Sequence, residues 1–191
     1  MRVAGLLLAA GAGRRMGRPK ALLHDADGTS FLGRAVGSLL DGGCEGVTVV
    51  LGADAGAVRE VLGLSGHAAV SVVVAQDWAE GMGASLRAGL SSLRDAPADA
   101  VVVTLVDLPD VDGDVVRRVV VAGTGPDALV RAEYGGRPGH PVLLGRHHWA
   151  QVAASAEGDR GARTYFRAHP PTPCECGDLA TGRDVDRPED L

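Results

Sequence analysis

Residues 3–20 read VAGLLLAAGAGRRMGRPK, in which an apolar run over Val3–Ala10 leads directly into a loop of glycine and basic side chains. An apolar run that stops at glycine is typical of a short buried β-strand followed by a tight loop. Three more β-branched apolar runs have the same character, and they lie at Val47–Leu51, Val70–Ala75 and Val101–Val106. We therefore expect these four runs to form buried strands of one sheet.

Segments with helical spacing of their apolar residues follow the strands. They are Phe31–Leu40 behind Thr29 or Ser30 as cap, Ala55–Leu62 behind Asp54 as cap, and Ser85–Leu93. Strands that are apolar on both faces and alternate with helices predict an α/β fold, in which helices cover both faces of a mostly parallel sheet. Ligands of such sheets bind at the carboxyl ends of the strands, so the loops there form the candidate site.

The second half of the chain has a looser pattern. Val115–Val121 fits either a helix or a strand, and Tyr134–Arg137 is a tight-turn sequence. Further strands are expected at Ala128–Ala132 and Pro141–Leu144, and helices at His148–Ala156 and Ala162–Ala168. With 191 residues and no linker, internal repeat or low-complexity tract, we expect a single domain over residues 1–191.

The composition excludes several classes of protein. Hydrophobic residues make up 46% of the chain and charged residues 23%, which rules out a disordered polymer. A net charge of -5 argues against a protein that coats nucleic acid, because a polyanion requires a basic surface. Only 3% of the residues are aromatic, so we expect any bound nucleotide to be free. No apolar run reaches the roughly 20 residues of a membrane span, and no membrane partner is expected.

The first ten residues imitate a secretory signal, since a positive charge precedes an apolar centre. We interpret them as a strand instead, because the run continues into the glycine and cation loop. The cysteines are few: Cys44 stands alone, and Cys174 and Cys176 match neither a zinc knuckle nor a disulfide framework. A reducing compartment, and hence a cytoplasmic location, is expected.

The glycine loop matches neither of two common nucleotide-binding patterns. A dinucleotide fingerprint G-x-G-x-x-G that starts at Gly11 and Gly13 would require glycine where the chain has Met16. A Walker A loop requires glycine directly before lysine, but Arg18-Pro19 separates Gly17 from Lys20. The loop therefore fits a third interpretation, in which backbone N–H groups and basic side chains hold a triphosphate.

Four basic side chains are available in that loop, at Arg14, Arg15, Arg18 and Lys20. Of the 19 lysine and arginine residues of the chain, Lys20 alone is a lysine. A compact ammonium group reaches a phosphate oxygen as a point charge where a planar guanidinium does not fit, so this exception indicates a chemical requirement.

Acidic residues occupy two positions that suit a metal ion. Asp107 follows the apolar run Val101–Val106 and precedes Pro109, so its carboxylate lies where a buried strand ends and can hold Mg²⁺ or cap a turn. Asp184 and Asp186 alternate along an extended segment, which places both carboxylates on the same side. Either of them could complete a metal site with Asp107.

The segment Gly81-Met82-Gly83-Ala84-Ser85 follows the third strand and opens a helix. Its backbone N–H groups and the Ser85 hydroxyl could face the sugar or phosphate of a nucleotide, and helix capping explains the segment equally well. A lone histidine such as His140 is more often structural than catalytic.

In this order, these segments resemble the molybdenum cofactor cytidylyltransferase group of the nucleotidyltransferase superfamily. The resemblance covers nearly the whole chain, and each segment alone is a weak signal, whereas six in order are specific. The segments are Leu8-Ala9-Ala10-Gly11 leading to Arg15-Met16-Gly17 and Lys20, Gly81–Leu86, Asp107-Leu108-Pro109, Gly139-His140-Pro141, Gly158–Arg163 and Asp184–Leu191.

The resemblance implies a Rossmann-like sheet of nucleotidyltransferase type, with a nucleotide-binding part over about 1–110 and an acceptor-binding part over about 111–191. It also implies transfer of CMP from CTP to the terminal phosphate of molybdopterin, with release of pyrophosphate and with Mg²⁺ as cofactor. The implied residues are Arg15, Lys20 and Asp107 for catalysis, Leu8, Ala9, Ala10, Gly11, Gly13, Gly81 and Ser85 for the nucleotide, His140, Asp159 and Arg163 for the acceptor, and Asp107 with Asp186 or Asp184 for the metal.

Several alternatives accompany this resemblance. Guanylyltransferase relatives tend to have Gly-Gly where this chain has Ala10-Gly11, which favours CTP, although another NTP or phosphorylated acceptor is an alternative. Similar chains also help to mature molybdenum hydroxylases, so a non-catalytic cofactor-binding chaperone with a hydroxylase apoenzyme as partner is the main rival. The presence of Lys20 and of both acidic positions disfavours it. An NAD-type oxidoreductase is disfavoured by the failed fingerprint.

Overall fold

The computed structural model describes residues 1–25, 27–63 and 68–190 of the chain. The strands are β1 (Val3–Leu8), β2 (Val47–Leu51), β3 (Val70–Val74), β4 (Ala100–Leu105), β5 (Leu129–Tyr134), β6 (Arg137–Gly145) and β7 (Thr172–Glu175). The α-helices are α1 (Phe31–Asp41), α2 (Ala55–Gly63), α3 (Met82–Ser92), α4 (Gly113–Ala122), α5 (Trp149–Ser155) and α6 (Arg163–Ala168).

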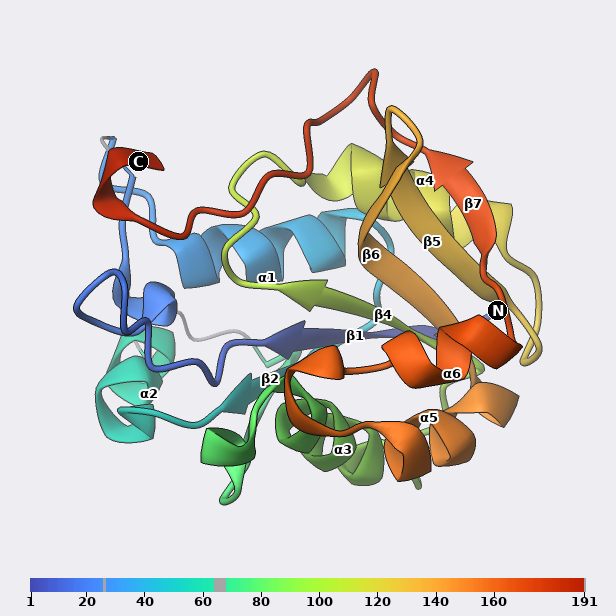
Figure 1. Cartoon of the computed structure of the whole chain (residues 1–191), viewed down its shortest axis with the longest axis horizontal. Coiled ribbons are helices and arrows are strands. Elements are labelled where there is room, and N and C mark those ends of the chain that lie inside the picture. The colour runs from blue at the N-terminus through green and yellow to red at the C-terminus, as the bar shows by residue number, and fades with distance from the viewer. Residues whose placement is uncertain (26, 64–67, 191) are drawn as a thin grey trace.

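Within these residues the strands form one seven-stranded sheet in the order β3-β2-β1-β4-β6-β5-β7 (Figure 1). β1 pairs in parallel with β2 and β4, so that Leu8 is in register with both Val50 and Leu105. β6 runs antiparallel between β4 and β5, whereas β7 pairs in parallel with β5. The sheet is therefore mostly parallel, and the α/β, Rossmann-like fold expected from the sequence is confirmed.

Helices cover both faces of the sheet, with α1 and α4 on one face and α3, α5 and α6 on the other (Figure 1). Alternate residues of β1 enter the two cores: Leu7 packs with the α1 side and Leu6 with the α3 side, and both are fully buried. This burial on both faces explains why the strand is a continuous apolar run. Among the described helices, none is long and apolar enough to cross a membrane.

The predicted strands are confirmed with small shifts at their ends. β1 ends at Leu8 rather than Ala10, although the N–H of Ala9 still donates to the carbonyl of Val50 at 2.9 Å. β3 ends one residue early, and its side chains are only partly buried because it is an edge strand. β4 spans Ala100–Leu105, one residue before the predicted range.

The helices of the first half also match, with corrections at their starts. Ser30 is the cap of α1, since its Oγ accepts from Gly33 N at 3.3 Å. α2 follows Asp54, whose carbonyl accepts from Val58 N at 3.1 Å, and it ends at Gly63 rather than Leu62. α3 begins at Met82, three residues before the predicted start, so Ser85 lies inside its first turn.

The ambiguous segment Val115–Val121 is helical and belongs to α4, which Asp112 caps through bonds from two backbone N–H groups. β6 has nine residues rather than the four predicted at Pro141–Leu144, because the turn at Gly135 and Gly136 continues the pairing with β5. β5 begins at Leu129, one residue later than expected, and continues to Tyr134 rather than ending at Ala132.

The C-terminal helices start later than predicted, and one strand was not foreseen. α5 begins at Trp149 after a 3₁₀ turn at Arg146–His148, and α6 begins at Arg163. β7 forms at the sheet edge, in a segment for which the sequence predicted no strand. The three cysteines are free and buried.

Candidate active site

The candidate site lies at the carboxyl ends of β1 and β4, where two loops leave the sheet side by side. Because Leu8 is in register with Leu105, the loop after β1 and the loop after β4 start next to each other. The first loop ends in a 3₁₀ turn at Lys20–Leu22, which the buried Ala21 anchors in the core. The second loop begins with Asp107. This topology brings Lys20 to Asp107 across 87 residues of sequence.

Lys20 lies between two carboxylates. Its Nζ donates to Asp107 Oδ2 at 2.7 Å and to Asp186 Oδ1 at 2.5 Å. Arg15 donates to the other oxygen of Asp186 at 3.1 Å. The side chains of Lys20 and Asp107 are 16% exposed, whereas that of Arg15 is 70% exposed. The ammonium is therefore sheltered from solvent, and Arg15 lies at the rim.

These contacts set the charge states of the cluster. Burial opposes the charge of Lys20, but the hydrogen bonds and charges of Asp107 and Asp186 outweigh it and raise the pKa of Lys20. The hydrogen bond from Lys20, together with the charges of Lys20 and Arg15, outweighs burial and lowers the pKa of Asp186. At neutral pH the cluster therefore holds a full ammonium and ionised Asp186.

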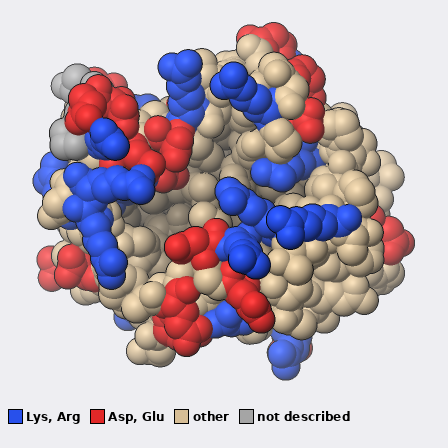
Figure 2. Space-filling view, viewed as in Figure 1, with Lys and Arg blue, Asp and Glu red and all other residues tan. Residues whose placement is uncertain are grey.

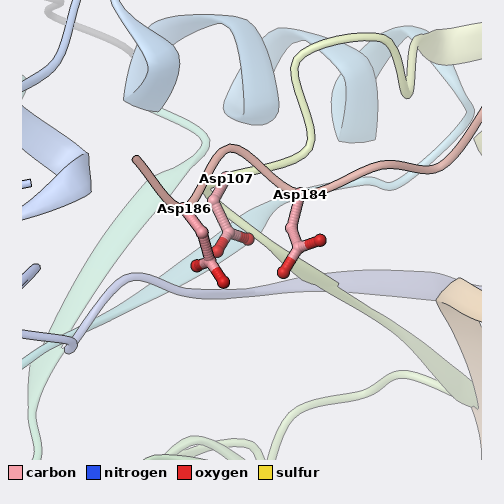
Figure 3. Close-up of side chains that lie close together, drawn as sticks. All are labelled: Asp107, Asp184 and Asp186. Carbon is pink, nitrogen blue, oxygen red and sulfur yellow. The ribbon is translucent and has the colours of Figure 1, made fainter. Parts of the chain in front are cut away.

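Residues 176–187, here called the C-terminal strap, return across the end of the sheet to complete the acidic cluster. The N–H of Val185 donates to the carbonyl of Asp107 at 2.9 Å. The N–H and the hydroxyl of Thr181 both donate to Asp110 Oδ2 at 2.6 Å. These bonds hold Asp184 and Asp186 beside Asp107, as Figure 3 shows.

The three carboxylates suit a divalent cation. One oxygen from each of Asp107, Asp184 and Asp186 lies within 4.8 Å of the others. Asp107 Oδ1 is buried and has no hydrogen-bond partner among the described residues, which is costly unless a ligand satisfies it. Carboxylate oxygens are the protein ligands that Mg²⁺ and Mn²⁺ prefer. The residues present therefore fit such an ion.

A first cleft of about 370 Å³ opens beside this cluster. All seven residues expected to contact a nucleotide line it: Leu8, Ala9, Ala10, Gly11, Gly13, Gly81 and Ser85. Lys20 and Asp107 line the same cleft. The structure adds Trp78 and the side chain of Met82; Met82 belongs to the segment Gly81–Ser85, which the sequence offered for its backbone N–H groups and the Ser85 hydroxyl.

A second cleft of about 350 Å³ adjoins the first, and the three expected acceptor residues His140, Asp159 and Arg163 line it. Asp159 also lines the first cleft, and Asp184 belongs both to the second cleft and to the acidic cluster. The two clefts therefore meet at the carboxylates. A hollow with both basic and acidic side chains around it is visible on this face in Figure 2.

Sequence reasoning missed Arg131 and Phe166, which also line the second cleft. Arg131 lies on β5, its Nε donates to the carbonyl of Gly139 at 3.1 Å, and its guanidinium carbon lies 5.8 Å from the centre of the Phe166 ring. A basic residue at a half-buried position of an apolar strand was the available signal. Burial and then the charges of Arg131 and Arg163 lower the pKa of His140 to about 4, so its imidazole is neutral at pH 7.

Comparison with known proteins places this geometry in a family. Residues 5–172 match the family described as MobA-like NTP transferase domain. A nicotine blue oxidoreductase from Paenarthrobacter nicotinovorans is 38% identical over 99% of this chain and 94% of its own length. A molybdenum cofactor guanylyltransferase from Rhodobacter capsulatus is 33% identical over 78% of this chain and 66% of its own length.

Solved structures show the same architecture. The crystal structure of Rv0371c from Mycobacterium tuberculosis H37Rv has a TM-score of 0.82 at 29% identity, with 100% of this chain and 95% of that chain covered. Rv0371c in complex with manganese has a TM-score of 0.72 at 26% identity, with 100% and 96% covered. The sequence match, the relatives and the fold agree, and the protein belongs to the MobA-like NTP transferase domain family.

Proposed function

We propose that the protein transfers CMP from CTP to the phosphate of a molybdopterin-type acceptor and releases pyrophosphate. The observation that carries this proposal is one polar cluster shared between two adjoining clefts: Lys20 and Asp107 line the first cleft, Asp184 lines the second, and Asp186 joins them in the cluster. One cleft would hold the nucleotide, and the other would present the acceptor to its α-phosphate. Residues of both halves of the chain line each cleft, so the parts over about 1–110 and 111–191 would act together.

The reaction requires neutralisation of negative charge, and it does not require a general base. An oxygen of the acceptor phosphate, already ionised at neutral pH, attacks the α-phosphorus as the bond to the β-phosphate oxygen breaks. The barrier lies in bringing two anions together and in supporting the charge on the departing pyrophosphate. Lys20 and Arg15 would supply the positive charge that offsets these anions. Lys20 would do so by exchanging a hydrogen bond to one of its carboxylate partners for a hydrogen bond to a phosphate oxygen.

We assign the metal site to Asp107 together with Asp186 or Asp184. A bound Mg²⁺ supplies charge neutralisation to the triphosphate. Both oxygens of Asp186 already accept bonds from Lys20 and Arg15, whereas Asp184 accepts none from the described residues. The manganese complex of Rv0371c supports a divalent cation in this family.

The choice of CTP rests on the pair Ala10-Gly11 in the loop after β1. Both residues line the first cleft, where a second glycine in place of alanine would give more room. We expect kcat/KM to favour CTP over GTP. The relative named as a guanylyltransferase makes GTP the sharpest competitor, and a higher kcat/KM for GTP would overturn this part of the proposal.

The decisive experiment is an incubation of the protein with Mg²⁺, molybdopterin and each of the four NTPs, with pyrophosphate release as readout. Release that requires both molybdopterin and one NTP supports the transferase. Tight molybdopterin binding without release from any NTP would instead support a cofactor-binding chaperone in the maturation of a molybdenum hydroxylase. We place the protein in the cytoplasm, since its three cysteines are free and buried.

A second function is favoured by one comparison, because a relative that matches 99% of this chain is named an oxidoreductase. In that case the same clefts would hold a reducible aromatic substrate and an electron donor. The two functions are separated by absorbance at 340 nm in the presence of NADH or NADPH, with and without nicotine blue. Nicotinamide oxidation without any pyrophosphate release would favour the oxidoreductase.

A further inference from the structure

The second cleft contains three arginines that none of its carboxylates neutralises. Arg131, Arg160 and Arg163 line the cleft, and none of them forms an ion pair with a described carboxylate. Elsewhere at the site Arg15 is paired with Asp186, and Arg87 with Asp77 and Glu80. The three arginines therefore leave the wall of the second cleft with positive charge that no described carboxylate pairs.

Arg131 is the most constrained of the three. Its Nε is fixed by the carbonyl of Gly139, and its guanidinium lies over the ring of Phe166. Within the described chain its two terminal nitrogens make no hydrogen bond. A planar guanidinium held in this way offers a fixed pair of donors, which matches carboxylate, phosphate and similar oxyanions.

The free protein keeps these positive charges close together at a cost. Burial and then the charge of Arg163 lower the pKa of Arg131, while the charge of Glu133 acts in the opposite direction. Burial, and then the charges of the same two guanidinium groups, lower the pKa of His140 and keep it neutral at pH 7. Like charges in a partly desolvated cleft are stabilised when an anion binds between them.

The carboxylates of the cleft lie on its other side. Asp159 lies against Gly81, since a Cβ on that glycine would be 2.6 Å from Asp159 Oδ1, and Asp184 is part of the acidic cluster. Both therefore face the nucleotide side. The cleft has an acidic end where the reaction would occur and a basic wall on β5 and α6.

We propose that Arg131 and Arg163 bind a second anionic group of the acceptor, separate from the phosphate that reacts at the Asp107 end. The acceptor then carries a second negative group besides the reacting phosphate, and Arg131 selects for that group. This inference rests on the proposed function in one respect, namely that the second cleft is the acceptor cleft.

The test measures direct binding rather than turnover. Two matched pairs of fluorescent flat molecules serve as probes: pterin-6-carboxylate with 6-hydroxymethylpterin, and 2-naphthoate with 2-naphthamide. In the wild-type protein the anionic member of at least one pair should bind about tenfold more tightly than its neutral partner, as a charge-assisted hydrogen bond predicts. Arg131→Gln should remove that preference, and Arg131→Lys should restore only part of it.

Arg167→Gln is the matched control, since Arg167 is exposed on α6 and lines neither cleft. It should keep the full preference. If Arg131→Gln fails to fold by circular dichroism, Arg163→Gln takes its place. Equal affinity for both members of each pair in the wild type, an unchanged preference in the folded variant, or no binding of any probe would each overturn the inference.

The outcomes also separate this inference from the proposed function. If 2-naphthoate binds more tightly than 2-naphthamide through Arg131, but neither pterin binds, the anion site is supported and a pterin acceptor is not. If molybdopterin supports pyrophosphate release but the anionic probes bind no more tightly than their neutral partners, the proposed transferase activity is supported and the anion-binding role of Arg131 is not.

Discussion

At the scale of single residues, Lys20 shows how sequence and site agree. The chain uses arginine at every other basic position, and the structure places the one ammonium between Asp107 and Asp186 at 2.7 and 2.5 Å. A compact ammonium has three N–H donors and can hydrogen-bond to two carboxylates and a phosphate at once, whereas a planar guanidinium in the same space cannot.

We expect Lys20→Ala to leave the protein folded and to lower kcat/KM for pyrophosphate release by about 10²–10³, since loss of one such charge contact typically costs about 2.7–4 kcal/mol in the transition state. Lys20→Arg should recover little of the rate. Arg59→Ala, at an exposed position of α2, is the control and should behave as wild type. Normal turnover in Lys20→Ala would assign the residue a structural role only.

The acidic cluster gives a second prediction. Asp107→Asn should lose nearly all activity, because its buried Oδ1 has no other partner among the described residues. Of Asp184→Asn and Asp186→Asn, only one should approach that loss, since Mg²⁺ usually takes one or two carboxylates, and that variant should require more Mg²⁺ for half-maximal rate. A Mg²⁺ titration of pyrophosphate release measures this. Wild-type rates in Asp107→Asn would contradict the assignment.

At the scale of elements, the C-terminal strap depends on a close contact with the ring of Tyr134 on β5. Gly182 has φ of 63° and lies so near that ring that a Cβ would be 2.2 Å from Cε2. Gly139 approaches the same ring, and the Tyr134 hydroxyl donates to the carbonyl of His140 at 2.6 Å. The ring therefore joins β6, which carries His140, to the strap, which carries Asp184 and Asp186.

We expect Gly182→Ala to move the strap and so to raise the Mg²⁺ concentration needed for half-maximal rate several-fold, with less effect on KM for the nucleotide. Gly125→Ala is a matched control, because Gly125 also has positive φ, at 75°, but no atom within 4 Å of the added Cβ. Both variants carry the backbone strain of roughly 1–2 kcal/mol, and only the first carries the clash. Identical Mg²⁺ dependence in the two would show that the ring contact does not position the acids.

The elements that the sequence predicted are those with a strong local signal. Val47–Leu51 is recovered to the residue because it is a fully buried, β-branched run. β7 was missed because Pro173 interrupts Thr172–Glu175, and proline is tolerated in a strand at a sheet edge, which the sequence does not reveal. Arg131 was missed for a related reason: its place in the second cleft depends on α6, whose Phe166 lies under the Arg131 guanidinium only once the chain has folded.

At the scale of the whole molecule, the rule that ligands bind at the carboxyl ends of parallel strands brought the expected nucleotide residues to one cleft. Two larger features had no local signal. The antiparallel insertion of β6 between β4 and β5 creates the second cleft, and the return of the strap completes the acidic cluster. Both depend on contacts between distant segments.

The stability of the whole molecule should depend on His140. The folded state lowers the pKa of His140 from 6.5 to about 4, so between these values the unfolded chain binds more protons. The free energy of unfolding should therefore fall as the pH drops from about 6.5 to about 4, by at most about 3 kcal/mol from this group.

Urea unfolding at pH 7 and at pH 4.5 measures the effect. His140→Gln should lose less stability between the two pH values than the wild type does, whereas His24→Gln, at an exposed position, should lose as much. Parallel losses in wild type and His140→Gln would show that this imidazole is not kept neutral by the fold.

The long separation between Lys20 and Asp186 has a consequence for the order of folding. Their contact closes a loop of 166 residues, whereas the parallel pairing of β1 with β2 brings together much nearer segments. Closing a larger loop costs more chain entropy, and such contacts form late unless earlier ones shorten the path. A refolding chain is therefore expected to regain its central strands first and its cation–acid pairing last, so recovery of activity should lag behind recovery of secondary structure.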